Sequence, residues 1–182
     1  MDVTDTTMRE AAEWAERNAP EGTLILAEEQ TAGRGRLGRN WVSQRGDGIY
    51  GSLILRPPVP ASRAAILTLV IGLGACRGIG EAAGVQCDIR WPNDVLLNDK
   101  KCCGVLLELA AEESRVRYAV AGFGINVNNV AMPPELTGSA TSLRIESGCE
   151  FVRQVVLDGV LRHMERYYEM FLERGQEPIV EA

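Results

Sequence analysis

The chain has 182 residues, of which 46% are hydrophobic and 24% charged, so it is long enough for one globular domain with a sizeable core. Its 19 basic and 25 acidic residues give a net charge of -6, which argues against a protein held mainly by phosphate backbones of nucleic acids. The longest apolar run, Ala64 to Cys76, is too short to span a membrane, and the N-terminus lacks the zones of a secretory signal, so a cytoplasmic domain is expected.

The first half of the chain predicts helices and strands separated by a polar loop. Apolar residues at helical spacing predict a helix over 7–17, and the run TLILA predicts a buried strand over 23–27. The segment 28–48 has no apolar periodicity and leads to a strand over 49–55. A long helix is then predicted over 61–83, ended by Gly84.

The second half predicts mainly strands and ends in a helix. Short strands are expected over 87–91 and 95–97, and two more follow over 104–110 and 115–121, joined by an acidic turn. The last helix is predicted over 149–174. Together with the first half, this order predicts an α+β fold in which a mixed β-sheet has its helices packed on one face.

The cysteines and the histidine limit the chemistry. His163 lies within the last helical pattern, where a structural role is expected, so triads that depend on histidine are excluded. No C-x-x-C pair occurs, and no direct ligand cluster for a metal is predicted. Reduced and mostly buried thiols are expected for all five cysteines: Cys76, Cys87, Cys102, Cys103 and Cys149. Any reaction must therefore depend on Arg, Lys, Asp, Asn and backbone amides.

The first chemical motif is GRGRLGR at residues 33–39, followed by Asn40 and Trp41. Its glycines allow the backbone to turn closely around a ligand, and its arginines carry permanent charges suited to carboxylates and phosphates. The motif therefore predicts a site for an anionic small molecule. A flexible nucleic-acid patch is the alternative, which the acidic composition and the short length of the segment disfavour.

The second motif is RWPND at residues 90–94, with Lys101 at the start of the next strand. A tight hairpin would bring Asp94 close to Lys101, so that the carboxylate could act on an incoming amine while the ammonium stabilises a reacting carboxyl group. Seen alone, the motif is more often a structural turn with a surface ion pair.

The third motif is GFGIN at residues 122–126, at the end of a predicted strand. Gly122 and Gly124 permit close approach of the backbone, and the asparagine offers an amide to a ligand. A strand with a bulge and a capped end explains the same residues equally well.

The three motifs in this order resemble the catalytic domain of the biotin protein ligase family, whose patterns are GRGRxGR, KWPND followed by K-x-x-G-[IV]-L, and G-x-G-[IL]-N. DTTM at residues 5–8 is similar to the family's DSTN, and ATSL at 140–143 to its ATSL. The resemblance covers nearly the whole chain. It implies the fold of the biotin and lipoate protein ligases, related distantly to class II aminoacyl-tRNA synthetase cores.

Three sets of site residues follow from this resemblance, each carried over by matching the motifs. The implied catalytic residues are Lys101, Arg36 and Asp94. The implied biotin-binding residues are Thr6, Thr7, Gln30, Gly33, Arg34, Gly35, Arg36, Lys101, Gly122 and Gly124. The implied ATP-binding residues are Arg34, Arg36, Arg39, Trp41, Asn93, Lys101 and Asn126, with Mg²⁺ carried by ATP close to Asn126.

The implied reaction has two steps: biotin and Mg-ATP form biotinyl-AMP and pyrophosphate, and a lysine of a biotin carboxyl carrier domain then accepts the biotin. Residues 1–182 are expected to form the catalytic domain alone, without an N-terminal DNA-binding domain or a complete C-terminal SH3-like domain. No nucleic acid or membrane partner is expected. A homodimer paired through the sheet, frequent in the family, is left open.

Departures from the family pattern leave alternatives to test. Thr6, Met8, Arg90 and Leu37 replace the usual Ser, Asn, Lys and a frequent Arg, and Met8 removes an amide that would make a hydrogen bond near the implied biotin site. A lipoate or octanoate protein ligase shares the implied fold but typically lacks the first two motifs together. A non-catalytic biotin-binding module is the second alternative, and it predicts binding of biotin without release of pyrophosphate.

Overall fold

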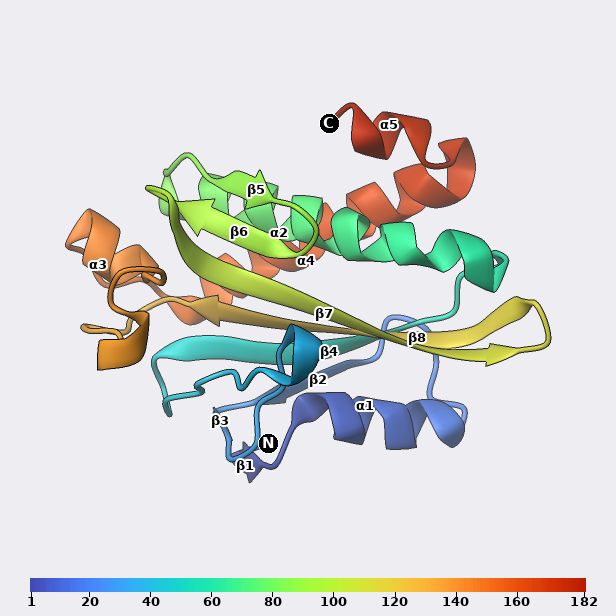
Figure 1. Ribbon diagram of the computed structural model, residues 1–182, viewed down its shortest axis with the longest axis horizontal. Coiled ribbons are helices and arrows are strands. Elements are labelled where there is room, and N and C mark those ends of the chain that lie inside the picture. Colours follow the sequence, from blue (N-terminus) through green and yellow to red (C-terminus); the bar gives the residue numbers. More distant parts are fainter.

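The computed structural model describes residues 1–182, and its centre is a six-stranded antiparallel sheet (Figure 1). A separate two-stranded sheet pairs β1 with β3 in parallel. Parallel pairing between named strands is confined to this small sheet, and the predicted α+β class is confirmed. In spatial order, the main sheet consists of β2 (Leu24–Ala27), β4 (Gly48–Leu55), β8 (Arg115–Asn126), β7 (Lys100–Glu112), β6 (Asp94–Leu97) and β5 (Asp88–Arg90), while β1 is Val3–Thr4 and β3 is Glu29–Gln30.

The two longest strands, β7 and β8, form a hairpin through the predicted acidic turn, where Glu113 adopts a positive φ of 55°. Both strands extend further than the sequence predicted, and β8 includes the whole GFGIN motif up to Asn126. The alternative reading of this motif as a bulge is wrong, since the bulge of the hairpin lies at Ala110 and Ala111. Strand β8 is buried over its second half because the main hydrophobic core covers one face, while Met8 and Trp41 cover Gly122 and Gly124 on the other.

One face of the sheet packs against two long helices, α2 (Leu67–Ala83) and α4 (Arg153–Arg174). The first turns of the predicted helix form a 3-10 helix, η2 (Ala61–Ile66), and Gly84 ends α2 in the left-handed conformation, as predicted. By length and composition alone, Ala61–Ala83 could cross a membrane, but 61% of its apolar 18-residue stretch is buried inside the fold. It is therefore the core helix.

Glycines bring the backbones of α2 and α4 into direct contact. A Cβ atom on Gly74 would lie 2.5 Å from the Cα atom of Met164, and one on Gly78 would lie 2.4 Å from the Cα atom of Val160. At the surface end of this interface His163 contacts Glu81 at 2.6 Å, and this hydrogen bond is the main reason that the pKa of Glu81 is lowered. The structural role predicted for His163 is thus supported by its position.

The opposite face of the sheet packs against α1 (Thr7–Glu16), which buries Met8, Ala11 and Ala15 against Ile25, Ile54 and other residues of a second core cluster (Figure 1). The prediction that the helices pack on one face holds for the two long helices, whereas α1 departs from it, because its apolar stripe buries a second core cluster on the opposite face. The Oγ1 atom of Thr6 caps α1 by accepting a hydrogen bond from the backbone amide of Met8 at 3.3 Å.

Short elements complete the chain, and the sequence did not predict them because they are too brief to show periodicity. The short elements are η1 (Arg36–Gly38), η3 (Pro134–Leu136), α3 (Leu143–Ser147) and α5 (Glu177–Val180).

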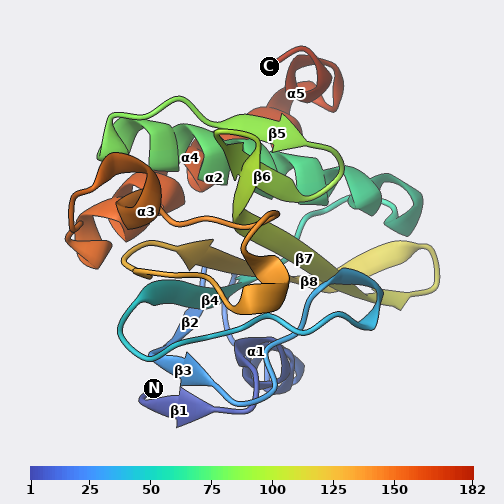
Figure 2. The same cartoon turned by 60° about the vertical axis from the view of Figure 1, so that its left-hand side comes forward.

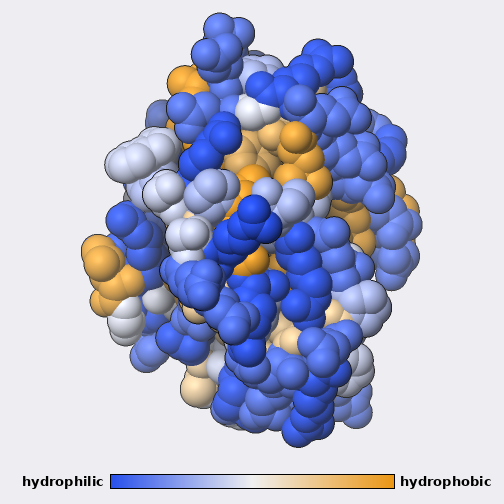
Figure 3. All heavy atoms as spheres, turned by 90° about the vertical axis from the view of Figure 1, so that its right-hand side faces the viewer, coloured by the Kyte–Doolittle hydropathy of each residue, from blue (hydrophilic) through white to orange (hydrophobic).

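The end of the molecule with the β7–β8 turn exposes mainly hydrophilic side chains, with hydrophobic atoms in small patches (Figure 3).

Candidate functional site

The three predicted motifs meet on the sheet face that α1 covers, where they line two adjoining cavities. The inner cavity has a volume of about 30 Å³ and lies between α1 and the sheet. The outer cavity has a volume of about 550 Å³ and lies between segments 35–44 and 126–140, which run side by side in Figure 2. Five residues line both cavities: Gly35, Arg36, Trp41, Asn93 and Lys101.

The inner cavity ends in a network of hydroxyl and amide groups. Gln30 accepts hydrogen bonds at its Oε1 atom from the backbone amide (2.8 Å) and the hydroxyl (3.1 Å) of Thr7. The Thr7 hydroxyl also lies 2.8 Å from that of the fully buried Ser52. The Nε2 atom of Gln30 donates to Ser43 at 3.1 Å. Ser43 and Ser52 were missed by the sequence prediction, because neither belongs to a motif and both come from separate segments.

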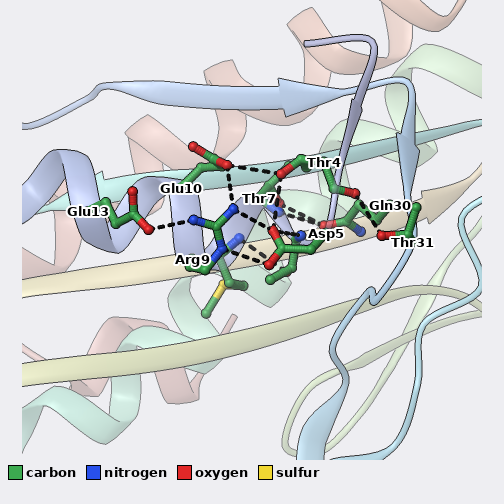
Figure 4. Close-up of polar contacts among 10 residues, drawn as sticks. Thr4, Asp5, Thr7, Arg9, Glu10, Glu13, Gln30 and Thr31 are labelled. Atoms are coloured by element: carbon green, nitrogen blue, oxygen red, sulfur yellow. Dashed lines mark hydrogen bonds and ion pairs between the residues drawn. The ribbon is translucent and has the colours of Figure 1, made fainter.

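The start of α1 is fixed by the ion-pair cluster shown in Figure 4. The guanidinium of Arg9 contacts both oxygens of Asp5, at 2.7 and 2.8 Å, and also Glu10 at 2.8 Å. Hydrogen bonds from Arg9 and from the backbone amide of Thr6 hold the pKa of Asp5 well below its usual range. The cluster is exposed to solvent, so it orients Thr6 and Thr7 without being part of the cavity.

Glycines open the floor of the inner cavity, as predicted for Gly122 and Gly124. A Cβ atom on Gly122 would lie 2.4 Å from the Sδ atom of Met8. Gly104 has the same role, since a Cβ atom there would lie 2.8 Å from the Nζ atom of Lys101. Met8 lines the inner cavity and is only 3% exposed, so the departure from the family pattern places a thioether where the family has an amide.

Trp41 separates the two cavities and covers the floor of the inner one. A Cβ atom on Gly124 would lie 2.3 Å from the indole, and the Nζ atom of Lys101 lies 5.3 Å from the ring centroid. The indole Nε1 atom is buried without a hydrogen-bond partner. The inner cavity, at about 30 Å³, has room for little more than a water molecule, so a larger ligand requires side chains that fill it, Trp41 among them, to move.

The arginine-rich loop is closed by backbone hydrogen bonds, from Trp41 to Gly33 at 2.9 Å and from Gly35 to Arg39 at 2.7 Å. Arg34 lines the inner cavity but pairs with Glu108 on β7 at 2.6 Å. Arg36 lines both cavities and Arg39 the outer one, and both side chains are exposed. The loop therefore presents two cations to the outer cavity.

Asp94 and Lys101 lie close together, as the hairpin predicted, with 2.6 Å between the carboxylate and the ammonium. Arg90 donates to the other carboxylate oxygen at 2.7 Å. Partial burial raises the pKa of Asp94, but hydrogen bonds from Arg90 and Lys101 outweigh this effect and lower the pKa overall. Asn93 lines both cavities, while its side chain donates to the Val105 carbonyl at 3.1 Å.

Asn126, predicted to bind ATP, lines the outer cavity, and its Nδ2 atom donates to the Thr141 carbonyl at 2.9 Å. No cluster of three or more His, Cys, Asp or Glu side chains that could hold a metal occurs. Other residues that line the outer cavity were not predicted from the sequence: Val42, Gln44, Asn129, Met132, Pro133 and Leu136.

Comparison with known proteins identifies a family and several related chains. The family model described as "Biotin/lipoate A/B protein ligase family" matches residues 1–126. The bifunctional ligase/repressor BirA of Bacillus spizizenii is 48% identical over 180 residues, which cover 98% of this chain and 55% of that protein. BirA of Escherichia coli is 30% identical over 157 residues, covering 86% of this chain and 49% of that protein. The chain thus spans about half the length of these relatives.

The fold is also found among solved structures. Biotin protein ligase from Aquifex aeolicus, in complex with biotin and ATP, superposes with a TM-score of 0.85 and 35% identity, covering 98% of this chain and 72% of that one. The predicted resemblance in fold is confirmed.

Proposed function

Since this chain belongs to the biotin/lipoate A/B protein ligase family, we propose that it activates biotin with ATP and transfers it to a lysine of a carrier domain. One observation carries the proposal: Lys101 and Arg36 line both cavities. A carboxylate in the inner cavity and a phosphate in the outer cavity could therefore contact the same two cations. This arrangement suits the joining of a carboxylic acid to a nucleotide.

In the first step, a carboxylate oxygen of biotin attacks the α-phosphorus of ATP, and the bond to pyrophosphate breaks. Negative charge develops on the phosphate oxygens, so preorganised cations such as Lys101, Arg36 and Arg39 stabilise the transition state. The ring of biotin would then lie toward Thr7, Gln30 and the other polar groups of the inner cavity. Trp41 must leave this cavity and would lie beside the nucleotide.

In the second step, the amine of the acceptor lysine attacks the acyl carbon of biotinyl-AMP, and AMP leaves with the electrons of the broken C–O bond. Asp94 lies beside Lys101 at the junction of the cavities. Because its pKa is lowered, Asp94 remains a carboxylate at neutral pH and is a weak base. We therefore propose that the Asp94 carboxylate orients the incoming amine by accepting a hydrogen bond from it.

Mg²⁺ fits this site only as an ion carried by ATP. The chain offers no cluster of carboxylates, and the Nδ2 atom of Asn126 is engaged with Thr141, which leaves its Oδ1 atom as a neutral oxygen ligand. When bound, the ion would neutralise charge on the phosphates. The acceptor is proposed to be a biotin carboxyl carrier domain in the cytoplasm, and a homodimer remains a prediction of the family resemblance.

The proposal is tested by pyrophosphate release from the purified chain with Mg-ATP and biotin, lipoate or octanoate, followed by transfer to a biotin carboxyl carrier domain. Release with biotin alone, followed by transfer, is expected. Release with lipoate or octanoate would assign the chain to the lipoate ligases instead. Binding of biotin without release would show a non-catalytic module.

A further inference from the structure

The backbone of Lys101 has a partner on each side, and only one of them belongs to the predicted hairpin. On one side β6 pairs with it. On the other side β8 pairs with β7 only from Cys103 onward, and segment 139–141 lies beside Lys101 instead. The Lys101 amide donates to the Ser139 carbonyl, and the Lys101 carbonyl accepts from the Thr141 amide, each at 2.9 Å. A distant part of the chain therefore fixes the backbone of this lysine.

Glu146 joins this segment to the turn of the β6–β7 hairpin. Its Oε1 atom accepts a hydrogen bond from the hydroxyl of the buried Thr141 at 2.6 Å. Its Oε2 atom accepts one from the Nδ2 atom of Asn98 at 2.7 Å. Asn98 has a positive φ of 49° and lies in the turn of the hairpin that carries Asp94 and Lys101. One carboxylate thus connects the two segments that flank Lys101.

Glu146 is itself held in place, because α3 is tied to the end of β8. The first residue of α3 is fully buried, and the backbone amide of Arg144 donates to the Val127 carbonyl at 2.9 Å. The Glu146 side chain is only 13% exposed. Hydrogen bonds from Asn98 and from Thr141 lower its pKa, so it is a carboxylate at neutral pH and accepts from both donors.

The ion pair of Glu146 with Lys100 is a weaker contact. The Nζ atom of Lys100 lies 3.5 Å from the carboxylate, and the Lys100 side chain is 41% exposed, so solvent screens the pair. The connection from Glu146 to Lys101 therefore depends on the hydrogen bonds from Thr141 and Asn98.

On the basis of the proposed function, we propose that Glu146 is a positioning residue of the reaction, which holds the backbone of Lys101 so that its ammonium stays at the junction of the two cavities. Glu146 lines neither cavity and acts only through the residues that it binds. A small displacement of a preorganised group is enough to reduce a rate strongly. No sequence motif assigned a role to Glu146.

The test compares biotin-dependent pyrophosphate release by Glu146→Ala and Glu146→Gln with that of the unchanged chain. In Glu146→Ala, kcat is expected to fall about tenfold at temperatures where circular dichroism shows a folded protein, because Lys101 is displaced from the reacting groups. Glu146→Gln retains an oxygen that accepts from Asn98 and an amide that donates to the Thr141 hydroxyl. It should therefore recover most of the rate.

Two further variants keep the inference testable if Glu146→Ala does not fold. Thr141→Val keeps the shape of the side chain and removes the hydroxyl, so it should lose part of the rate. Glu150→Ala is the matched control, because Glu150 is 70% exposed and pairs with Arg144 at 3.7 Å. Its rate should equal that of the unchanged chain, and a rate in Thr141→Val equal to that of this control would contradict the inference.

The combination with Lys101→Ala separates positioning from a general structural role. If Glu146 acts through Lys101, adding Glu146→Ala to Lys101→Ala should cause no further loss of rate. A structural role would lower the rate by the same factor whether or not Lys101 is present, and that outcome would overturn the inference. So would an unchanged rate in Glu146→Ala beside an active unchanged chain. Absence of release by the unchanged chain would contradict the proposed function, and the role of Glu146 with it.

Discussion

Glycines on the two sides of the main sheet differ in what fills the space beside them. On the core face, Gly74 and Gly78 let the backbone of α2 touch that of α4, and this space is permanently filled. On the site face, the space above Gly122 and Gly124 is filled by the side chains of Met8 and Trp41. A backbone cannot withdraw without unfolding, whereas a side chain can change rotamer. Close packing by side chains is therefore compatible with a site that opens.

The largest expected effect tests whether the site face contains the reaction centre. Lys101→Ala should reduce pyrophosphate release on the order of a hundredfold or more, equivalent to about 2.7 to 4 kcal/mol of transition-state stabilisation, as for other preorganised donors. The free energy of unfolding should change little, since the Lys101 side chain is partly exposed. Lys100→Ala is the control, because Lys100 pairs with Glu146 instead. Equal rates for the two variants would remove Lys101 from the reaction.

The next effect tests the core face. Gly78→Ala should lower the free energy of unfolding by about 1–3 kcal/mol, because the new methyl group would meet the backbone of Val160. Gly72→Ala in the same helix has nothing within 4 Å of its Cβ position and should stabilise the protein by up to about 1 kcal/mol through helix propensity. Chemical denaturation measures both. If Gly78→Ala were as stable as Gly72→Ala, the backbone contact would not be permanent.

A smaller effect on stability, with a larger effect on binding, is expected on the site face. Gly124→Ala should displace the Trp41 indole at little cost to folding, since Trp41 can move, but it should weaken biotin binding by about tenfold because the methyl group occupies the cavity floor. Calorimetry of biotin binding and thermal unfolding separate the two effects. A loss of stability as large as that of Gly78→Ala would contradict the difference between the faces.

The smallest expected effect is a pH dependence of stability at the Asp94 pair. The lowered pKa of Asp94 means that its stabilising contribution is complete above the unfolded value of about 3.9 and is lost as the pH falls through the folded value. The difference in unfolding free energy between the unchanged chain and Asp94→Asn should therefore shrink below about pH 4. Denaturant titrations at several pH values measure it. A constant difference would show that the ion pair does not affect stability.

The local parts of the site could be predicted from the sequence. Asp94 and Lys101 are seven positions apart on one hairpin, so short-range geometry alone brings them together. The glycines and arginines of residues 33–39 belong to a single loop, and the glycines predicted that its backbone makes close turns. Gly122 and Gly124 lie on one strand, and alternation places both on the same face.

The sequence by itself determined the long helices and the main strands, the α+β class and the three motifs, because periodicity, turns and hairpins depend on near neighbours. Only the tertiary structure decided which face of the sheet α1 covers, since an amphipathic stripe does not specify its partner. It also decided that Ser52 faces Thr7, that Trp41 closes the inner cavity, and that Glu146 holds Thr141 beside Lys101. These contacts join segments far apart in the chain, and their energies depend on packing and desolvation, which exist only once the chain has folded.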